Sequence, residues 1–274
     1  MRKLLFTDLD GSLLDHHTYE FQAALPAIGG LNEQRIPWIL TTSKTASEVV
    51  QLRVELGNNF PFIVENGAGI FWRAGDIDIS LLPDAFRVES WNCEFEYASL
   101  NPVPLSTILD VAAALKVQHE FQFKGFSEMT PEQVAECTGL TLEKAERAKC
   151  RQFSEPLLWE DSDESLRRFG DCVAPYQLQV IRGGRFVHLL GLSDKGDALA
   201  FLSDYYRKLW QSTVQTMALG DGQNDVPLLE RSDRPVVIRS PVNAIPGVNH
   251  NNVQITEACG PVGWNQAVLS WLES

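Results

Sequence analysis

The sequence predicts an α/β fold in which a doubly wound parallel sheet is interrupted by an inserted α+β domain. Two observations lead to this prediction. Short apolar runs without a polar face alternate with helical segments up to Val64, and the same alternation resumes after Leu190. Between about residues 83 and 188 the alternation lapses. Apolar strands separated by helices are typical of parallel sheets that are buried on both faces.

The first part of the chain contains the predicted beginning of the sheet. Strands are expected at Lys3–Thr7, Ile36–Thr42 and Phe60–Val64, and helices at Glu20–Gln34 and Ser47–Leu56. Strand, helix, strand, helix, strand within roughly 60 residues is the pattern of Rossmann-like sheets, which bind ligands at the carboxyl ends of their strands. We therefore expect functional residues directly after these strands.

The last part of the chain continues this pattern. The expected elements are, in order, a helix, a strand, a helix, a strand and a helix at Lys195–Trp210, Val214–Leu219, Asp225–Arg231, Pro235–Ile238 and Val262–Leu272. We expect residues 1–82 and 190–274 to form the catalytic core and residues 83–189 to form a substrate-specificity domain. A cleft between the two is then the expected ligand site.

The inserted segment has its own helix and strand signals. Helices are expected at Ser106–Leu115, after Thr130 and at Thr141–Lys149, because threonines are good N-caps and Pro131 suits a first helical position. Residues Gln177–His188 contain two apolar runs around a Gly-Gly turn, which predicts a β-hairpin.

The formal net charge of -13 excludes some classes of partner. An acidic surface repels nucleic acid and anionic membranes at long range, so neither is expected to bind. The same surface disfavours an anionic metabolite. A site for such a small molecule must therefore be built locally, from a metal ion and a few basic side chains.

Cysteine usage and hydropathy indicate the compartment. The five cysteines are scattered, odd in number and without a CxxC pair, which argues against a disulfide framework or a zinc site. No apolar run approaches the roughly 18 residues of a membrane span. Asp8 and Asp10 interrupt the N-terminal apolar run, which argues against a signal peptide. We expect a cytoplasmic protein with reduced thiols; the sequence makes no prediction of its oligomeric state.

Two aspartates follow the first predicted strand and should lie at its carboxyl end. There Asp8 would be positioned to attack a phosphorus atom, and Asp10 would protonate the leaving oxygen and later activate water. Gly11 permits a tight turn after them. Taken alone, the pair is equally compatible with a turn or with helix N-caps, which aspartates often form after strands.

A second acidic cluster follows the apolar run Val214–Leu219. Carboxylate and carbonyl oxygens suit Mg²⁺, which takes one or two carboxylates and keeps several waters. We expect Asp221 to bind this ion directly, and Asp225 to bind it through water or to hold Lys195. Asn224 is expected to orient the loop or a carboxylate. A helix N-cap turn is the alternative interpretation of this run alone.

Two further segments offer groups for an anion. Thr42, Ser43 and Lys44 end the second predicted strand, where a hydroxyl and backbone N–H groups can hold a phosphoryl oxygen. Lys195 opens a predicted helix, where its charge opposes the helix dipole unless an anion or a carboxylate offsets it. The alternatives are a simple strand-to-helix turn for the first segment and a solvated surface lysine for the second.

Together, the four segments occur in the order Asp-x-Asp, Thr, Lys and Gly-Asp-x-x-Asn-Asp. This set resembles the haloacid dehalogenase superfamily of phosphotransferases, over about residues 1–80 and 190–274. The resemblance implies a C2-type cap for the insertion and Mg²⁺ as the cofactor. The roles that it implies are nucleophile for Asp8, general acid and base for Asp10, phosphate binding for Thr42 and Lys195, and metal binding for Asp8, the Asp10 carbonyl and Asp221 with support from Asp225.

Five short sequence segments in the core and the insertion limit the range of possible substrates. They are Thr41–Thr45, Val64–Ala68, Lys124–Thr130, Arg151–Pro156 and Arg182–His188. Together they resemble the mannosyl-3-phosphoglycerate phosphatases, a family within this superfamily. The resemblance implies hydrolysis of mannosyl-3-phosphoglycerate to mannosylglycerate and phosphate through an aspartyl-phosphate intermediate.

Such a substrate carries a carboxylate, a phosphate and many hydroxyls. Backbone N–H groups of the Gly183–Gly184 turn, helped by Arg182 or Arg185, would bind the carboxylate. Glu65 and Asn66 would bond the hydroxyls. A plain hairpin turn with exposed arginines is the alternative interpretation of the Arg-Gly-Gly-Arg run.

Other functions compete with this hypothesis. A different sugar-phosphate phosphatase (sucrose-phosphate-like, glucosyl-3-phosphoglycerate or broad in specificity) or a phosphomannomutase-like enzyme would use the same core motifs. A non-catalytic metabolite-binding protein on the same scaffold would usually lack the nucleophile or a metal ligand. Here the four residues concerned are all present: Asp8, Asp10, Lys195 and Asp221.

Overall fold

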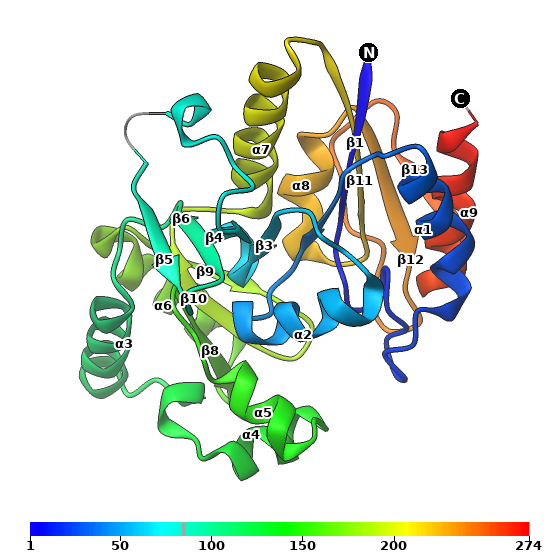
Figure 1. Ribbon diagram of the computed structural model, residues 1–274. Helices are drawn as coiled ribbons and strands as arrows, with labels where there is room; N and C mark the ends of the chain where they lie inside the picture. Colours follow the sequence, from blue (N-terminus) through cyan, green and yellow to red (C-terminus); the bar gives the residue numbers. More distant parts are fainter. Residues whose placement is uncertain (84–85, 274) are drawn as a thin grey trace.

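The computed structural model describes residues 1–83 and 86–273, and its strands form two separate sheets (Figure 1). Among these residues, nine strands make up the larger sheet in the order β13-β12-β11-β1-β2-β3-β4-β6-β5. Four strands make up the smaller sheet in the order β7-β8-β10-β9. The predicted α/β core with an inserted α+β domain is confirmed.

The parallel part of the larger sheet is buried on both faces except at its edge strand β13, which is largely exposed. Its strands are β1 (Arg2–Thr7), β2 (Trp38–Thr41), β3 (Phe62–Val64), β11 (Val214–Gly220), β12 (Arg234–Arg239) and β13 (Gln254–Cys259). Central strand β1 lies between β2 and β11. Its side chains alternate between the faces, so Leu5 packs into one apolar cluster and Leu4 and Phe6 into the other.

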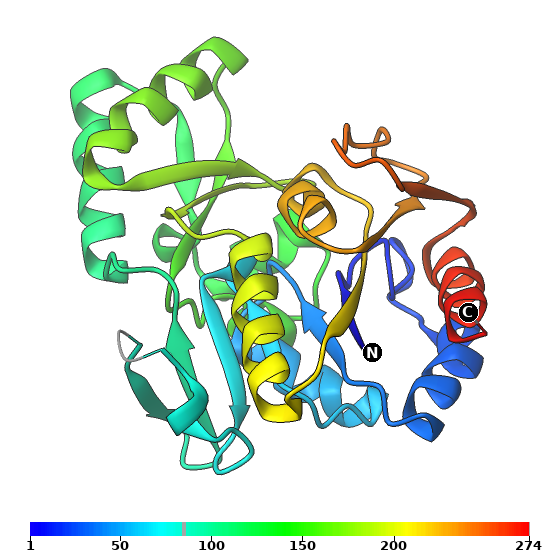
Figure 2. The same ribbon diagram turned by 90° about the horizontal axis from the view of Figure 1, so that it is seen from above.

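Helices cover both faces because both are apolar. The core helices are α1 (Leu25–Glu33), α2 (Ala46–Leu56), α7 (Lys195–Trp210), α8 (Val226–Glu230) and α9 (Gly260–Leu272). The first two and α9 contribute to the cluster around Leu5, whereas α7 and α8 contribute to the cluster around Phe6. Figure 2 shows α1 and α9 side by side at one end of the core.

Antiparallel strands extend the larger sheet beyond β3. These are β4 (Gly69–Arg73), β5 (Val88–Trp91) and β6 (Phe95–Ser99). Strands β5 and β6 fall within the segment 83–189 that the sequence assigns to the insertion, although they pair with the core sheet through β4. The domain boundaries at 82 and 190 stay a prediction.

We call the segment from Leu105 to Gly191, with the smaller sheet and its helices, the cap. Its strands are β7 (Phe123–Gly125), β8 (Ser154–Trp159), β9 (Leu178–Arg182) and β10 (Val187–Gly191), and its helices are α3 (Leu105–His119), α4 (Pro131–Thr138), α5 (Leu142–Ala148) and α6 (Asp163–Val173). The predicted N-caps are confirmed, since Thr130 accepts from the Gln133 N–H and Thr141 from the Lys144 N–H. The predicted hairpin is formed by β9 and β10.

Helices α3 and α6 pack against one face of the cap sheet, through residues such as Ile108 and Phe169. The opposite face carries Ser154, which bonds to a core carboxylate, and His188. That face is therefore turned toward the core. Over residues 1–83 and 86–273, none of the helices combines the length and apolar character needed to cross a membrane.

Candidate active site

The carboxyl ends of β1 and β11 bring the two acidic segments together. The strands are parallel neighbours, and the Asp8 N–H donates to the Leu219 carbonyl at 2.8 Å. Asp8, Asp221 and Asp225 are all buried, and one carboxylate oxygen from each lies within 4.8 Å of the others. The structure therefore brings together residues that are more than two hundred positions apart in the chain.

The turn after Asp8 requires glycine at position 11. Gly11 has a φ of +82°, which L-residues rarely adopt. A Cβ at this position would lie 2.5 Å from Oδ2 of Asp221. A side chain here would force the Asp221 carboxylate to move from its place in the cluster.

Lys195 is the first residue of α7 and its side chain is fully buried. Asp194 caps the helix by accepting from the Asp197 N–H, which fixes the direction in which Lys195 leaves the backbone. Its Nζ lies 2.6 Å from Oδ1 of Asp8 and forms a second ion pair with Asp225. Burial lowers the pKa of Lys195, but the charges of Asp225 and Asp8 more than offset this and raise it overall.

The clustered carboxylates repel one another. Burial and then the negative charge of Asp225 raise the pKa of Asp8 well above its ordinary value, although Lys195 opposes this. Burial and the charge of Asp225 likewise raise the pKa of Asp221 to about 6. A hydrogen bond from Asn243 acts in the opposite direction and lowers this pKa. The site as it stands has more negative charge than Lys195 neutralises, so a further cation would stabilise it.

The residues present fit a magnesium ion. The available donors are oxygen atoms, which Mg²⁺ prefers, and they are buried at a strand edge. Asp8, Asp221 and the Asp10 carbonyl would hold the ion. Asp225 is engaged otherwise: one of its oxygens pairs with Lys195, and the other accepts the Asp221 N–H at 3.1 Å and the Gly222 N–H at 3.0 Å.

Asp10 is paired with Lys44 across the mouth of the site. Their side chains form an ion pair of 2.6 Å, from Nζ of Lys44 to Oδ2 of Asp10. The other Asp10 oxygen is buried and has no hydrogen-bond partner among the described residues. Lys44 therefore lies beside the group that the sequence assigns as general acid and base.

Thr42 and Asn66 are buried beneath the residues that line the cavity. The Thr42 hydroxyl is buried and accepts the Lys44 N–H at 3.2 Å, so it shapes the loop that carries Ser43 and Lys44. Asn66 is also buried and accepts a hydrogen bond of 3.1 Å from the side chain of Asn224. Thr42 and Asn66 thus support residues that reach the cavity.

A cavity of about 640 Å³ lies between the core and the cap. The predicted site residues that line it are Asp8, Asp10, Ser43, Lys44, Arg182, Gly183, Gly184, Arg185, Asp221 and Asn224. Four of the lining residues are basic, namely Lys44, Arg151, Arg182 and Arg185. Four acidic residues line it too, namely Asp8, Asp10, Glu48 and Asp221, so the anion site expected from charge arguments stays a prediction.

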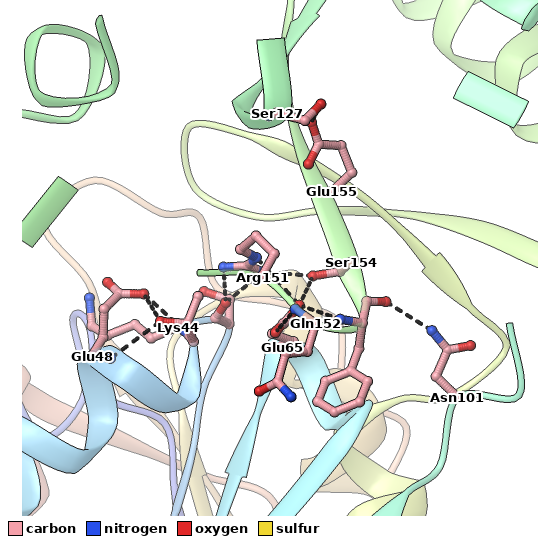
Figure 3. A network of polar contacts seen from close by, with 12 residues as sticks. Lys44, Glu48, Glu65, Asn101, Ser127, Arg151, Gln152, Ser154 and Glu155 are labelled. Carbon is pink, nitrogen blue, oxygen red and sulfur yellow. Dashed lines mark hydrogen bonds and ion pairs between the residues drawn. The ribbon is translucent and has the colours of Figure 1, made fainter. Parts of the chain in front are cut away.

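Glu65 is buried and its carboxylate points at the cap (Figure 3). It accepts hydrogen bonds from the Gln152 N–H at 2.9 Å, the Phe153 N–H at 3.1 Å and the Ser154 hydroxyl at 2.7 Å. It also forms an ion pair with Arg151. Its oxygens are occupied by the cap in this arrangement, so they are not placed to bond substrate hydroxyls.

Three of the polar groups in the β9–β10 hairpin also have protein partners. The Gly183 N–H, expected to bind a carboxylate, donates to the Phe186 carbonyl at 2.9 Å. Arg182 pairs with Asp163, and Arg185 donates to the Thr138 carbonyl at 2.7 Å. Both arginines still line the cavity, and their charges act there.

The chain is similar in sequence to known proteins. Residues 5–83 match the sequence profile of the haloacid dehalogenase-like hydrolases. Over 98% of its length, the chain is 34% identical to a glucosyl-3-phosphoglycerate/mannosyl-3-phosphoglycerate phosphatase from Methanococcoides burtonii, covering 97% of that protein. The chain belongs to the haloacid dehalogenase superfamily. A second phosphatase of the same name, from Persephonella marina, is 33% identical over 97% of the chain and 95% of its own length.

Solved structures support the superfamily fold. A superfamily phosphatase from Bacteroides thetaiotaomicron aligns over 100% of this chain and 96% of its own with a TM-score of 0.65 and 19% identity. A sucrose-phosphatase from Synechocystis, solved with sucrose and phosphate, aligns over 99% and 98% with a TM-score of 0.61 and 14% identity. Membership of this superfamily of phosphatases indicates a phosphoric monoester hydrolase.

Asn243, Arg151 and His188 are among the residues of this haloacid dehalogenase-like site that were not predicted. Asn243 donates to Oδ2 of Asp221 at 2.8 Å from a loop that has no recognisable motif. Arg151 and His188 line the cavity from the cap. Both lie in strings that carry the family resemblance, but their positions depend on how the cap meets the core, which no local pattern reveals.

Proposed function

We propose that the protein is a Mg²⁺-dependent phosphatase that hydrolyses mannosyl-3-phosphoglycerate to mannosylglycerate and phosphate. The observation that carries the proposal is the Asp8 carboxylate. It is held by Lys195 beside Asp221 and Asp225 and it faces a cavity with four basic side chains. The names of the two relatives support the substrate class.

In the first step, an Asp8 oxygen attacks the phosphorus atom and the P–O bond to the glycerate breaks. Lys195 favours the ionised form of Asp8 and orients it. Asp10 gives its proton to the leaving oxygen, which becomes the free hydroxyl of the glycerate. When bound, Mg²⁺ supplies charge neutralisation for the phosphate against the carboxylates.

In the second step, a water molecule attacks the phosphorus of the aspartyl phosphate on Asp8. Asp10, now ionised, takes a proton from that water. The acyl phosphate bond breaks, phosphate leaves and the Asp8 carboxylate is restored. Asp10 ends the cycle protonated, as it began.

The cavity suits a polyanionic substrate. A glycosyl phosphoglycerate carries a carboxylate in addition to its phosphate, and Lys44 with the cap arginines provides positive charge for both. Glucosyl-3-phosphoglycerate is a second candidate substrate because the names of both relatives include it. The cytoplasmic location stays a prediction of the sequence.

Release of inorganic phosphate from a panel of esters tests the proposal. The panel contains mannosyl- and glucosyl-3-phosphoglycerate, sucrose 6-phosphate, simple hexose phosphates and an aryl phosphate, each with Mg²⁺ and with a chelator. Turnover should need the metal and should favour a glycosyl phosphoglycerate by kcat/KM. Equal turnover of the hexose phosphates would refute the substrate, and phosphate transfer back to the sugar would indicate a mutase.

A further inference from the structure

His188 is placed on the wall of the cavity by strand alternation. Its neighbours Val187 and Leu189 point into the apolar core of the cap, so His188 lies on the opposite face of β10. There it is paired in register with Pro156 of β8, and both line the cavity. The side chain is only 7% exposed.

The two ring nitrogens of His188 have different surroundings. Nδ1 is buried and has no hydrogen-bond partner within the described part of the chain. Nε2 is therefore the nitrogen that remains for the cavity. A tautomer with its proton on Nε2 leaves only a lone pair unpartnered at Nδ1, which is less unfavourable than a buried unpartnered N–H.

The hairpin glycine makes room for this ring. A Cβ at Gly183 would lie 3.0 Å from Nε2 of His188, closer than ordinary van der Waals contact. Glycine at position 183 thus contributes to the site by leaving space for the His188 ring. Its N–H does not contribute, because it is already bonded to the Phe186 carbonyl.

His188 is a neutral donor over the pH range in which enzymes are assayed. Burial, followed by the positive charges of Arg151 and Lys195, lowers the pKa of His188 to about 3. A neutral N–H suits a hydroxyl or ether oxygen. The phosphate, in contrast, belongs beside Asp8, the expected nucleophile.

We propose that His188 is a specificity-determining residue whose Nε2 binds an oxygen of the glycosyl or glycerate part of the substrate. This inference rests on the proposed function and deepens it, because it names the cap residue that recognises the organic part of the ester. A buried polar group built to bond a ligand oxygen rejects ligands that lack it, since the group is then left unpaired.

The experiment compares two substrates across matched variants. His188→Leu removes both nitrogens, and His188→Gln keeps an N–H near the position of Nε2. Steady-state kinetics are measured with a glycosyl phosphoglycerate and with an aryl phosphate, which has no sugar or glycerate. His119→Leu is the control, since His119 lies on α3 of the cap and does not line the cavity.

His188→Leu should lower kcat/KM for the glycosyl phosphoglycerate by about 10- to 100-fold, mainly through KM, and should change the aryl phosphate by less than about twofold. His188→Gln should recover activity to within about fivefold of wild type. The melting temperature of His188→Leu should equal or exceed that of wild type, because an unpartnered buried nitrogen is removed.

Equal losses on both substrates, or a glycosyl phosphoglycerate activity that does not change, would overturn the assignment of His188. So would a lower melting temperature with no recovery in His188→Gln, which indicates a packing role. Failure of the proposed function looks different. Wild-type protein would then hydrolyse the aryl phosphate and neither glycosyl phosphoglycerate, and that result would also remove the ligand named here.

Discussion

Glu65 of the core and Arg151 of the cap form a buried ion pair, with Nε of Arg151 3.4 Å from Oε2 of Glu65 and side chains 0% and 6% exposed (Figure 3). The same guanidinium donates through both terminal nitrogens to the Ser43 carbonyl at 3.1 Å. Ser43 belongs to the loop expected to hold phosphate. The contact between cap and core is thus coupled to the geometry of that loop.

Replacing Glu65 by Gln should destabilise the protein by about 2–4 kcal/mol, because it leaves the buried Arg151 charge without its carboxylate. It should also raise protease sensitivity between the cap and the core. Denaturant unfolding and limited proteolysis measure the two effects. Glu143→Gln is the matched control: Glu143 is exposed on α5 and pairs with Arg147, so its loss should change stability by less than about 1 kcal/mol. Equal effects of the two variants would contradict the conclusion that Glu65 holds the cap against the core.

Much of the core was predictable because local signals and the global fold agree there. Helix α7 begins and ends where the sequence predicts it, at Lys195 and Trp210, since a capping box of Asp194 and Asp197 fixes its start. Strand β1 has an apolar, fully buried centre at Leu4, Leu5 and Phe6, which is a strong signal of a parallel strand.

Several other elements were not predicted because their side chains are mixed. Strand β5 has an intermediate-to-exposed pattern, and β13 is largely exposed, so neither contains the apolar run by which a buried strand is recognised. Strand β8 contains Pro156. Helix α6 was missed although Ser162 caps it and its pattern is amphipathic, which is a signal that the sequence does carry.

The site residues, like the fold elements, could be predicted only in part. Asp8 and Asp221 could be paired from sequence because parallel strand ends meet at one edge of the sheet. Glu65 follows such a strand end too, but its partners lie 87 to 89 residues away in the cap. Only the docked domains reveal that it binds the protein and does not line the cavity.

The contribution of Asp221 to the stability of the metal-free protein should fall as pH rises from about 4 to about 6. Asp221 has its pKa raised from 3.8 to about 6 in the folded state, so between these values the folded state binds more protons than the unfolded chain. Stability therefore decreases with pH across this window, by on the order of 1–3 kcal/mol from this residue. Asp221→Asn should remove that part of the slope.

Unfolding curves of wild type and Asp221→Asn at several pH values, with a chelator present, give the difference directly. Carboxylates outside the site cancel in the comparison, whereas Asp8 contributes to the difference because the charge of Asp221 helps to raise its pKa. Mg²⁺ added at pH 7 should stabilise wild type and have a much smaller effect on Asp221→Asn. If wild type instead gained stability relative to Asp221→Asn as pH rises from 4 to 6, the result would contradict mutual repulsion among the carboxylates of the site.

Asp8→Asn should abolish phosphatase activity, lowering kcat by at least about 10³-fold, because the amide is a poor nucleophile. Its fold should survive, since the substitution removes one of several mutually repelling negative charges and leaves Lys195 paired with Asp225. Phosphate release and thermal unfolding are measured together. Asp204→Asn, at an exposed ion pair on α7, should keep full activity. Residual turnover of Asp8→Asn above about one tenth of wild type would exclude Asp8 as the nucleophile.

Lys44→Gln should reduce kcat/KM by about 10- to 100-fold on glycosyl phosphoglycerates. Lys44 holds Oδ2 of Asp10 at 2.6 Å and adds a positive charge to a cavity that must accept at least two anionic groups. Its loss should therefore act on both orientation of the general acid and binding of the substrate.

Lys116→Gln is the control, because Lys116 forms a comparable ion pair with Glu128 outside the cavity. An aryl phosphate keeps the phosphate but has no glycerate carboxylate. A loss there reports the effects of Lys44 on Asp10 and on the phosphate, and an additional rise in KM confined to the glycosyl phosphoglycerate reports carboxylate binding. If Lys44→Gln behaved like Lys116→Gln on both substrates, the pair with Asp10 would have no part in the reaction.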